Sequence, residues 1–174
     1  GPPCAPSRLP PRSGRGAAFR HGMPASGGRF VGFTAADRPY DLDALRTAID
    51  MVASGGVDVV FGARDATGAV CRVRRRFSRR LATRLFRTLV GRALSLAVTD
   101  PQCALKVFTR QAAQDIFARA QVDGFAFDSE VAILAQVLGL RLRTIPVHWL
   151  HDDSSTISLW RHGLPMAIDL LRLR

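Results

Sequence analysis

The sequence contains little cysteine, with three residues in a chain of 174 and no C-x-x-C pair. Cys4, Cys71 and Cys103 are odd in number and widely spaced, so the sequence predicts neither a disulfide framework nor a zinc site. No apolar run approaches the ~20 residues of a membrane-spanning helix, and the N-terminus lacks the hydrophobic core of a signal peptide. The length of 174 residues, 47% of them hydrophobic, predicts one domain. The absences favour a reducing cytoplasm, and they do not exclude attachment to a membrane surface.

Lysine is nearly absent, because Lys106 is the one lysine among 25 basic residues. The formal net charge is nevertheless +11, so arginine carries almost all of the positive charge. Arginine suits bidentate contacts with phosphate, and the expected partner is therefore a phosphate compound. Nucleotide sugars, lipid phosphates, anionic headgroups and nucleic acid all satisfy this condition, and the charge alone does not separate them.

Strand and helix patterns alternate along the first half of the chain, which predicts an α/β fold. Residues 1–11 hold five prolines and are expected to form a disordered leader, so the domain is expected over residues 12–174. Residues 12–23 form a glycine-punctuated basic turn that opens a short helix and could present backbone N–H groups to an anion. A strand is predicted at 28–34, a helix at 42–52 with an apolar face, and a buried strand at 56–62. The predicted apolar face of that helix consists of Leu42, Leu45, Ile49 and Val52.

Arg64 follows the second of these strands, at the end where open α/β sheets bind ligands. The next tract, residues 72–99, has no acidic residue and predicts a basic amphipathic helix near 74–95. Three interpretations compete, namely a solvated face, a nucleic-acid helix, and a helix that lies on a membrane surface or contacts lipid phosphate. Its phenylalanines fall on or near the apolar face, which disfavours base stacking, so no nucleic acid is expected.

The run from Thr99 to Glu130 combines several signals of a site. A turn is predicted at 100–103, a strand at 104–108, a cap at Thr109 and a helix over 111–119. Asp128 and Glu130 then open an apolar helix that ends at Gly139. Carboxylates in a first helical turn stabilise the helix dipole, and this ordinary role competes with a role in a site. After a strand at 140–149, the residues 157–174 predict either an interfacial helix or a capping helix.

The segments DPQCALKVFTR, DGFAFDSE and IPVHWLHDDSS resemble the family 2 glycosyltransferases that use polyprenyl phosphate acceptors. The dolichyl-phosphate glucosyltransferase and mannosyltransferase branch is the most similar. The resemblance implies a Rossmann-like fold of the GT-A type and inverting transfer of a hexose from a nucleotide sugar, with UDP-glucose favoured. It also implies Mg²⁺ or Mn²⁺, and a peripheral position on the cytoplasmic face of an anionic membrane. The alternative is an inactive remnant that serves as a basic module for membrane or nucleic-acid binding.

Only the later part of the family's domain has a counterpart in this sequence. We therefore expect an N-terminally truncated domain with an unpaired sheet edge and little transferase activity. In the family an Asp-x-Asp turn holds the metal, and here Ala35 replaces the first carboxylate, which leaves Asp37 with a weakened metal site. Thr156 replaces a lysine of a later loop.

The resemblance also implies roles for individual residues. Asp128 and Glu130 would order the sugar or acceptor pocket as the catalytic pair, with Asp128 a base only if the acceptor is a hydroxyl. Arg79 and Thr83 are four apart, so a helix would place both on one face, and together with Arg64 they are expected to converge on one anion. The residues expected to bind substrate or phosphate are Arg15, Arg64, Arg79, Thr83, Gln102, Lys106, His151 and Ser155.

Overall fold

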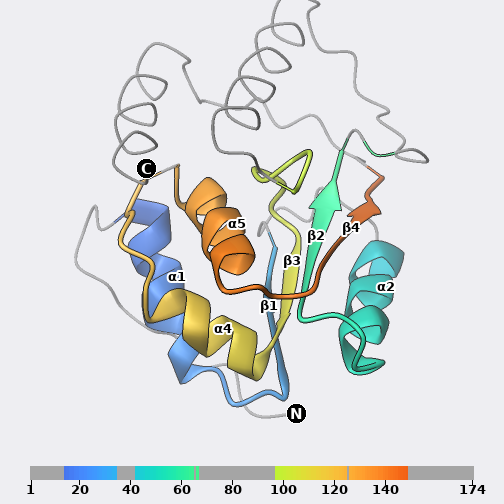
Figure 1. Ribbon diagram of the computed structural model, residues 1–174, viewed down its shortest axis with the longest axis horizontal. Helices are drawn as coiled ribbons and strands as arrows, with labels where there is room; N and C mark the ends of the chain where they lie inside the picture. The colour runs from blue at the N-terminus through green and yellow to red at the C-terminus, as the bar shows by residue number, and fades with distance from the viewer. Residues whose placement is uncertain (1–13, 35–41, 65, 67–96, 125, 149–174) are drawn as a thin grey trace, which may run out of the picture.

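The computed structural model describes residues 14–34, 42–64, 66, 97–124 and 126–148 (Figure 1). Within them, helices and strands alternate around one mixed sheet, and this confirms the predicted α/β class. The elements in chain order are α1 (Gly14–Ala25), β1 (Phe30–Phe33), α2 (Leu42–Ala53), β2 (Val59–Ala63), β3 (Lys106–Thr109), α4 (Arg110–Phe117), α5 (Phe127–Val137) and β4 (Leu142–Pro146).

The four strands are arranged in the order β1-β3-β2-β4. β3 is antiparallel to both β1 and β2, whereas β2 and β4 are parallel. The C-terminal ends of β1, β2 and β4 therefore lie at one end of the sheet, where β3 begins. The register places Phe33 of β1 and Phe61 of β2 on either side of Lys106, the first residue of β3. This end of the sheet brings together side chains from distant parts of the sequence.

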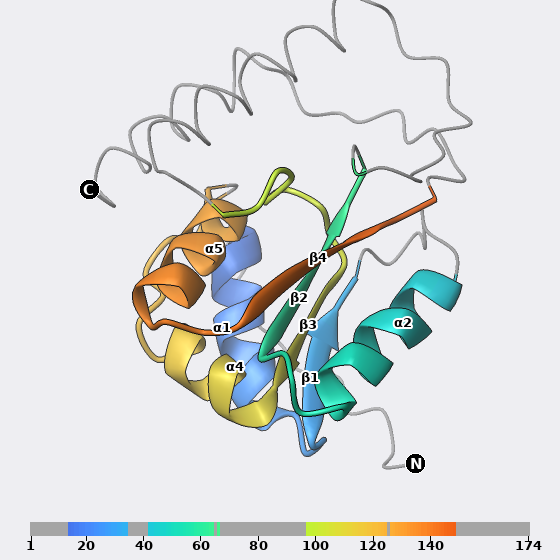
Figure 2. The ribbon, with the colours of Figure 1, turned by 45° about the vertical axis from the view of Figure 1, so that its right-hand side comes forward.

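Helices cover both faces of the sheet, with α1, α4 and α5 on one side and α2 on the other (Figures 1 and 2). The alternation of side chains along each strand separates two cores. The core under α1, α4 and α5 is rich in aromatic rings, and Phe19 of α1 stacks on Phe33 at 4.0 Å between centroids. The core under α2 is aliphatic. Every residue of β2 is buried, which confirms the prediction of a strand covered on both faces.

The predicted apolar face of α2 is partly wrong. The helix is present at the predicted place, but Ala44, Ala48 and Val52 form its buried stripe. Leu42 is 57% exposed and Ile49 is 37% exposed. The stripe has the i, i+4, i+8 spacing of one helical face, and its small residues let the helix backbone approach the aliphatic side chains of the sheet.

The ends of several elements confirm their sequence signals. The hydroxyl of Thr109 accepts a hydrogen bond from the N–H of Ala112 at 3.2 Å, so Thr109 caps α4 as predicted. Gly139 has φ of +65° directly after the last turn of α5, a conformation that favours glycine. Pro146 is the last residue of β4. The turn at 100–103 is closed by the N–H of Cys103, which donates to the carbonyl of Asp100 at 3.1 Å.

An ion pair joins the residues that directly precede the parallel strands β2 and β4. Arg141 donates from Nε and Nη2 to the two carboxylate oxygens of Asp58, at 2.9 Å and 2.8 Å. The backbone N–H of Arg141 also donates to Asp58, and the N–H of Asp58 donates to the carbonyl of Arg141. The side-chain hydrogen bond from Arg141 is the main reason that the pKa of Asp58 is lowered from its ordinary value.

Within the described part of the chain, β1 and β4 are the outer strands of the sheet. A groove of about 420 Å³ runs along β1, and Leu45 and Ile49 of α2 line its other side. None of the described helices is both long and apolar enough to cross a bilayer. The leader at 1–11 and the helices predicted near 74–95 and 157–174 lie outside the described residues.

Candidate functional site

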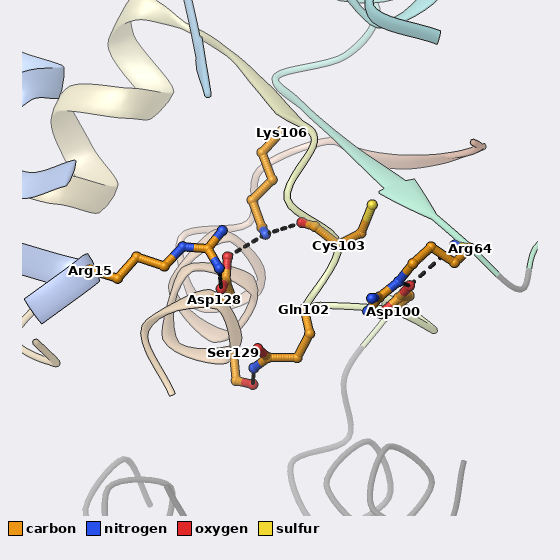
Figure 3. A network of polar contacts seen from close by, with 8 residues as sticks. All are labelled: Arg15, Arg64, Asp100, Gln102, Cys103, Lys106, Asp128 and Ser129. Carbon is orange, nitrogen blue, oxygen red and sulfur yellow. Dashed lines mark hydrogen bonds and ion pairs between the residues drawn. The ribbon is translucent and has the colours of Figure 1, made fainter. Parts of the chain in front are cut away.

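A buried lysine lies at the centre of the polar groups near the start of β3 (Figure 3). Lys106 is fully buried, and its Nζ donates to Asp128 Oδ1 and to the carbonyl of Cys103, both at 2.7 Å. The same ammonium group lies over the faces of the Phe33 and Phe61 rings, 5.1 Å from each ring centroid. These contacts desolvate the charge and compensate for it with a carboxylate, a carbonyl dipole and two π faces.

Asp128 connects this lysine to the surface. Its Oδ1 contacts Lys106, while its Oδ2 accepts no hydrogen bond among the described residues and lies 3.3 Å from Arg15 Nη1. The Asp128 side chain is 0% exposed, whereas that of Arg15 is 32% exposed. Lys106, Asp128 and Arg15 thus form a row of alternating charges that begins in the core and ends at the surface with a cation.

α5 places Asp128 and Glu130 in its first turn, as predicted, but the two carboxylates have different surroundings. Both oxygens of Glu130 accept backbone hydrogen bonds, from Gln121 at 2.8 Å and from Val122 at 3.0 Å. Glu130 is only 2% exposed. These contacts hold the loop before α5 in place, and the catalytic role expected for Glu130 stays a prediction.

The first turn of α1 packs against the same loop. The N–H of Gly16 donates to the carbonyl of Asp123 at 2.9 Å, and Arg20 donates to the carbonyl of Val122 at 2.9 Å. A Cβ atom at Gly14 or Gly16 would overlap these two loop carbonyls. The glycine-punctuated turn is confirmed as a helix start. However, the N–H of Gly16 already has a protein partner, so it is not available to the anion that the sequence suggested.

Two further polar pairs flank the row of charges. Gln102 donates from Nε2 to the hydroxyl of Ser129 at 3.2 Å, which joins the turn before β3 to α5. Arg64 forms a bidentate ion pair with Asp100, from Nε to Oδ2 at 2.7 Å and from Nη2 to Oδ1 at 2.8 Å. The N–H of Arg64 also donates to Asp100 Oδ2. The turn 100–103 therefore contacts both β2 and α5.

The structure brings together some of the predicted residues, whereas others lie outside its described part. Arg15, Lys106 and Asp128 meet, and Gln102 contacts Ser129 of the same helix as Asp128. Lys106 is buried with its ammonium group against protein groups, and its contact with phosphate stays a prediction. The remaining predicted residues, which lie outside the described part of the chain, are Asp37, Arg79, Thr83, His151 and Ser155. The convergence of Arg64 with Arg79 and Thr83 stays a prediction.

Sequence reasoning gave no functional role to Asp100 or Ser129. Each lies beside a residue that was singled out, Asp100 in the turn of Gln102 and Ser129 between Asp128 and Glu130. Asp100 is buried against Arg64, so its part in the site depends on a contact across 36 residues that no local pattern reveals. Ser129 was identifiable only as a member of the DGFAFDSE segment.

The described carboxylates do not fit a divalent metal ion. No group of three His, Cys, Asp or Glu side chains suited to a metal occurs within residues 14–34, 42–64, 66, 97–124 and 126–148. Asp100 and Asp128 both face cationic side chains, and a metal ion at either carboxylate would be repelled by the neighbouring charge. Asp37, the predicted metal ligand, lies outside the described part.

Comparisons with solved structures agree with this fold. A crystal structure described as a mycobacterial protein superposes with a TM-score of 0.67 at 18% identity, covering 95% of this chain and 53% of that one. Glucosyl-3-phosphoglycerate synthase from Mycobacterium tuberculosis, solved with Mn²⁺, UDP-glucose and glycerol 3-phosphate, superposes with a TM-score of 0.63 at 17% identity. That match covers 95% of this chain and 55% of the other. The fold is thus a partial GT-A glycosyltransferase fold.

Sequence comparisons identify the relatives. Dolichyl-phosphate β-glucosyltransferase of Drosophila melanogaster is 31% identical over 165 residues, covering 92% of this chain and 51% of the relative. The enzyme of the same name from Dictyostelium discoideum is 26% identical over 171 residues, covering 96% and 52%. The chain thus spans about half the length of the curated relatives it matches. Residues 2–117 match the description of glycosyl transferase family 2. The chain therefore belongs to glycosyl transferase family 2.

Proposed function

We propose that this chain acts in the transfer of glucose from UDP-glucose to a polyprenyl phosphate of the dolichyl type, with inversion at the sugar carbon. The two sequence relatives described above are named as dolichyl-phosphate β-glucosyltransferases, and a structural neighbour was solved with UDP-glucose. The alternative of an inactive basic module for membrane or nucleic-acid binding has no support from these comparisons.

The observation that carries the proposal is the row of charges formed by Lys106, Asp128 and Arg15. Lys106 and Asp128 compensate each other inside the core, so the row has one net positive charge, and Arg15 carries it at the surface. A partly exposed guanidinium group that is held in place by a buried carboxylate is suited to a phosphate ligand. Asp128 acts here as a positioning residue, because its partner Arg15 is the exposed member of the pair.

The chemistry of the proposed reaction requires little activation of the acceptor. A phosphate monoester has a second pKa of ~6, so a polyprenyl phosphate reaches the enzyme mostly as a dianion that can attack the sugar carbon. The work of the protein is to align donor and acceptor, to neutralise the departing diphosphate, and to exclude water. Arginine side chains supply the first two functions, and we propose Arg15 and Arg64 among the described residues for them.

The other expected contacts complete the proposal. Gln102 is placed by Ser129 beside the same helix that carries Asp128, so its amide can take part in binding a sugar or phosphate oxygen. Arg79, Thr83, His151 and Ser155 are proposed as further ligand contacts. Mg²⁺ or Mn²⁺, which accompanies UDP in structures of the mycobacterial synthase, is proposed to contact Asp37. We propose that the chain lies at the cytoplasmic face of an anionic membrane, near its lipid substrate.

The decisive experiment measures transfer of labelled glucose from UDP-glucose to a short polyprenyl phosphate with Mg²⁺ or Mn²⁺. The chain as printed, its Ala35→Asp variant and versions extended with flanking sequence from the same locus are compared. We expect little turnover by the unextended chain, because Ala35 and Thr156 each replace a charged group of the family pattern. Loss of one electrostatic contact typically lowers a rate by about 10² to 10³.

The extended versions make this test specific. Glucosyl transfer that appears on extension and rises further with Ala35→Asp would support both the reaction and the metal contact. Transfer of mannose from GDP-mannose in place of glucose would contradict the donor assignment. Absence of any hexosyl transfer by every version, with the fold intact by circular dichroism, would reject the proposed function.

A further inference from the structure

Glu130 is fully engaged with backbone groups, although it belongs to the same motif as Asp128. Its two oxygens accept the N–H groups of Gln121 and Val122, at 2.8 Å and 3.0 Å, and it is almost completely buried. A buried carboxylate needs such donors, and here two consecutive amides of one loop supply them. The charge of Glu130 is therefore used to fix the backbone of the loop at 121–123.

The carbonyl groups of that loop accept hydrogen bonds from a different element, the helix α1. The carbonyl of Val122 accepts from Arg20 Nη1 at 2.9 Å, and the carbonyl of Asp123 accepts from the N–H of Gly16 at 2.9 Å. Arg20 also forms an ion pair with the Asp123 carboxylate. The N–H groups of the loop thus bind α5, and its carbonyl groups bind α1. Movement of the loop would shift the first turn of α1.

Arg15 lies between the two glycines whose close approach allows this packing. Because Gly14 and Gly16 have no Cβ, the backbone on both sides of Arg15 lies directly against the loop carbonyls. The position of the Arg15 Cα is consequently set by the loop, while its guanidinium group lies 3.3 Å from Asp128 Oδ2 and 5.5 Å from the centre of the Phe19 ring. Asp128 and Glu130 therefore both act on Arg15, one directly and one through the loop.

We propose that Glu130 is a positioning residue that sets Arg15 against Asp128 through the loop at 121–123, and that it thereby strengthens phosphate binding by Arg15. The nature of the phosphate ligand rests on the proposed function, whereas the connection from Glu130 to Arg15 rests on the contacts alone. Two separate measurements can therefore test the two parts.

The first measurement follows the connection without any ligand. In Glu130→Gln the amide group can accept only one of the two backbone hydrogen bonds and places its NH₂ against the other donor. We expect the amide hydrogen of Gly16 to exchange about tenfold faster in this variant, since the loop that accepts its hydrogen bond is loosened. Asp115→Asn, which removes an exposed carboxylate on α4, is the control for the change in charge. Unchanged exchange at Gly16 in the folded Glu130→Gln variant would overturn the connection.

The second measurement is a double-mutant cycle with Arg15→Ala, using inorganic phosphate and UDP-glucose as separate probes. Glu130→Gln is expected to weaken binding of at least one probe by about tenfold when Arg15 is present, and to have no further effect in the Arg15→Ala background. An equal weakening in both backgrounds would indicate general destabilisation and would overturn the proposal. If Glu130→Gln does not fold, Glu130→Asp, which keeps the charge but is one methylene shorter, takes its place in both measurements.

The outcomes separate this inference from the proposed function. Faster exchange at Gly16 and coupled binding of phosphate, together with no hexosyl transfer by any version of the chain, would support the positioning role and count against the transferase proposal alone. Binding of neither probe by the unsubstituted chain would overturn the phosphate-binding half of the inference, and exchange at Gly16 would still decide the connection.

Discussion

Asp100 binds Arg64 through both of its carboxylate oxygens, at 2.7 Å and 2.8 Å, and the same carboxylate accepts the backbone N–H of Arg64. The two partners differ in burial, because the side chain of Asp100 is 0% exposed and that of Arg64 is 21% exposed. The pair fixes the end of β2 to the turn that precedes β3. It also holds an arginine at the carboxyl end of β2, where ligands are expected in an open α/β sheet.

This difference in burial predicts unequal effects of breaking the pair from its two sides. Arg64→Met leaves a buried carboxylate without its bidentate partner and should cost about 3 to 5 kcal/mol of unfolding free energy. Asp100→Asn leaves a cation that can still reach water, and should cost about 1 to 2 kcal/mol. Urea unfolding of both variants measures the difference. Asp115→Asn, in an exposed pair with Arg119, should change stability by less than about 0.5 kcal/mol. Equal losses in Arg64→Met and Asp100→Asn would contradict the unequal burial of the pair.

Two glycines of α1 offer a matched test of the contact between α1 and the loop. A Cβ at Gly16 would overlap the carbonyl of Val122, so Gly16→Ala must push α1 away from the loop and should cost about 2 to 4 kcal/mol. Gly22 lies in the same helix with no atom within 4 Å of its Cβ position. Gly22→Ala should therefore stabilise the chain by up to about 1 kcal/mol. Thermal or urea unfolding compares the two, and a tolerated Gly16→Ala would contradict the close packing.

The sequence predicted the order of elements well because the decisive signals are local. Thr109 before a helical run, Gly139 after one, and Pro146 at the end of a strand act through their own backbone preferences, which tertiary contacts do not override here. The face of α2 was mispredicted because hydrophobicity identified Leu42 and Ile49. The helix instead buries the small residue Ala48, because it lies close to the sheet. How close it lies depends on the residues beneath it, which the pattern of the helix alone does not show.

The candidate site was predicted only in part, because some of its contacts also depend on tertiary structure. The family pattern identified Arg15, Lys106 and Asp128, which the fold brings together, but it did not distinguish a ligand contact from a structural contact. The burial of Lys106 between Phe33 and Phe61 follows from the register of three strands, and the partners of Glu130 lie in a loop with no regular pattern. Such assignments depend on long-range geometry that the spacing of residues does not contain.

The ion pair between Asp58 and Arg141 predicts a dependence of stability on pH. Its side-chain hydrogen bond lowers the pKa of Asp58 in the folded state below the unfolded value of ~3.9. The unfolded chain therefore binds the proton more readily, so the stabilisation is fully present above about pH 5 and is lost as the pH falls through the lowered pKa. The midpoint of thermal unfolding for wild type should exceed that of Asp58→Asn by about 2 °C or less at pH 7, since the Arg141 side chain of the pair is 57% exposed. This advantage should shrink as the pH falls to about 3, and a constant difference would contradict the assignment.

Stability and ligand binding should depend in different ways on the buried pair of Lys106 and Asp128. Lys106→Met leaves the Asp128 carboxylate buried without its closest cation and should cost about 3 to 5 kcal/mol of unfolding free energy. Adding Asp128→Leu removes that charge as well, and the double variant should regain most of the loss, because apolar side chains of similar volume replace a desolvated ion pair at little net cost. The double variant should nevertheless bind phosphate more weakly than wild type, since Arg15 then has no carboxylate to hold its guanidinium group. Urea unfolding and phosphate titration of the single and double variants test the two effects together. Recovery of both stability and phosphate binding in the double variant would show that the row of charges supports the fold alone, whereas recovery of stability without binding would assign the row to the site.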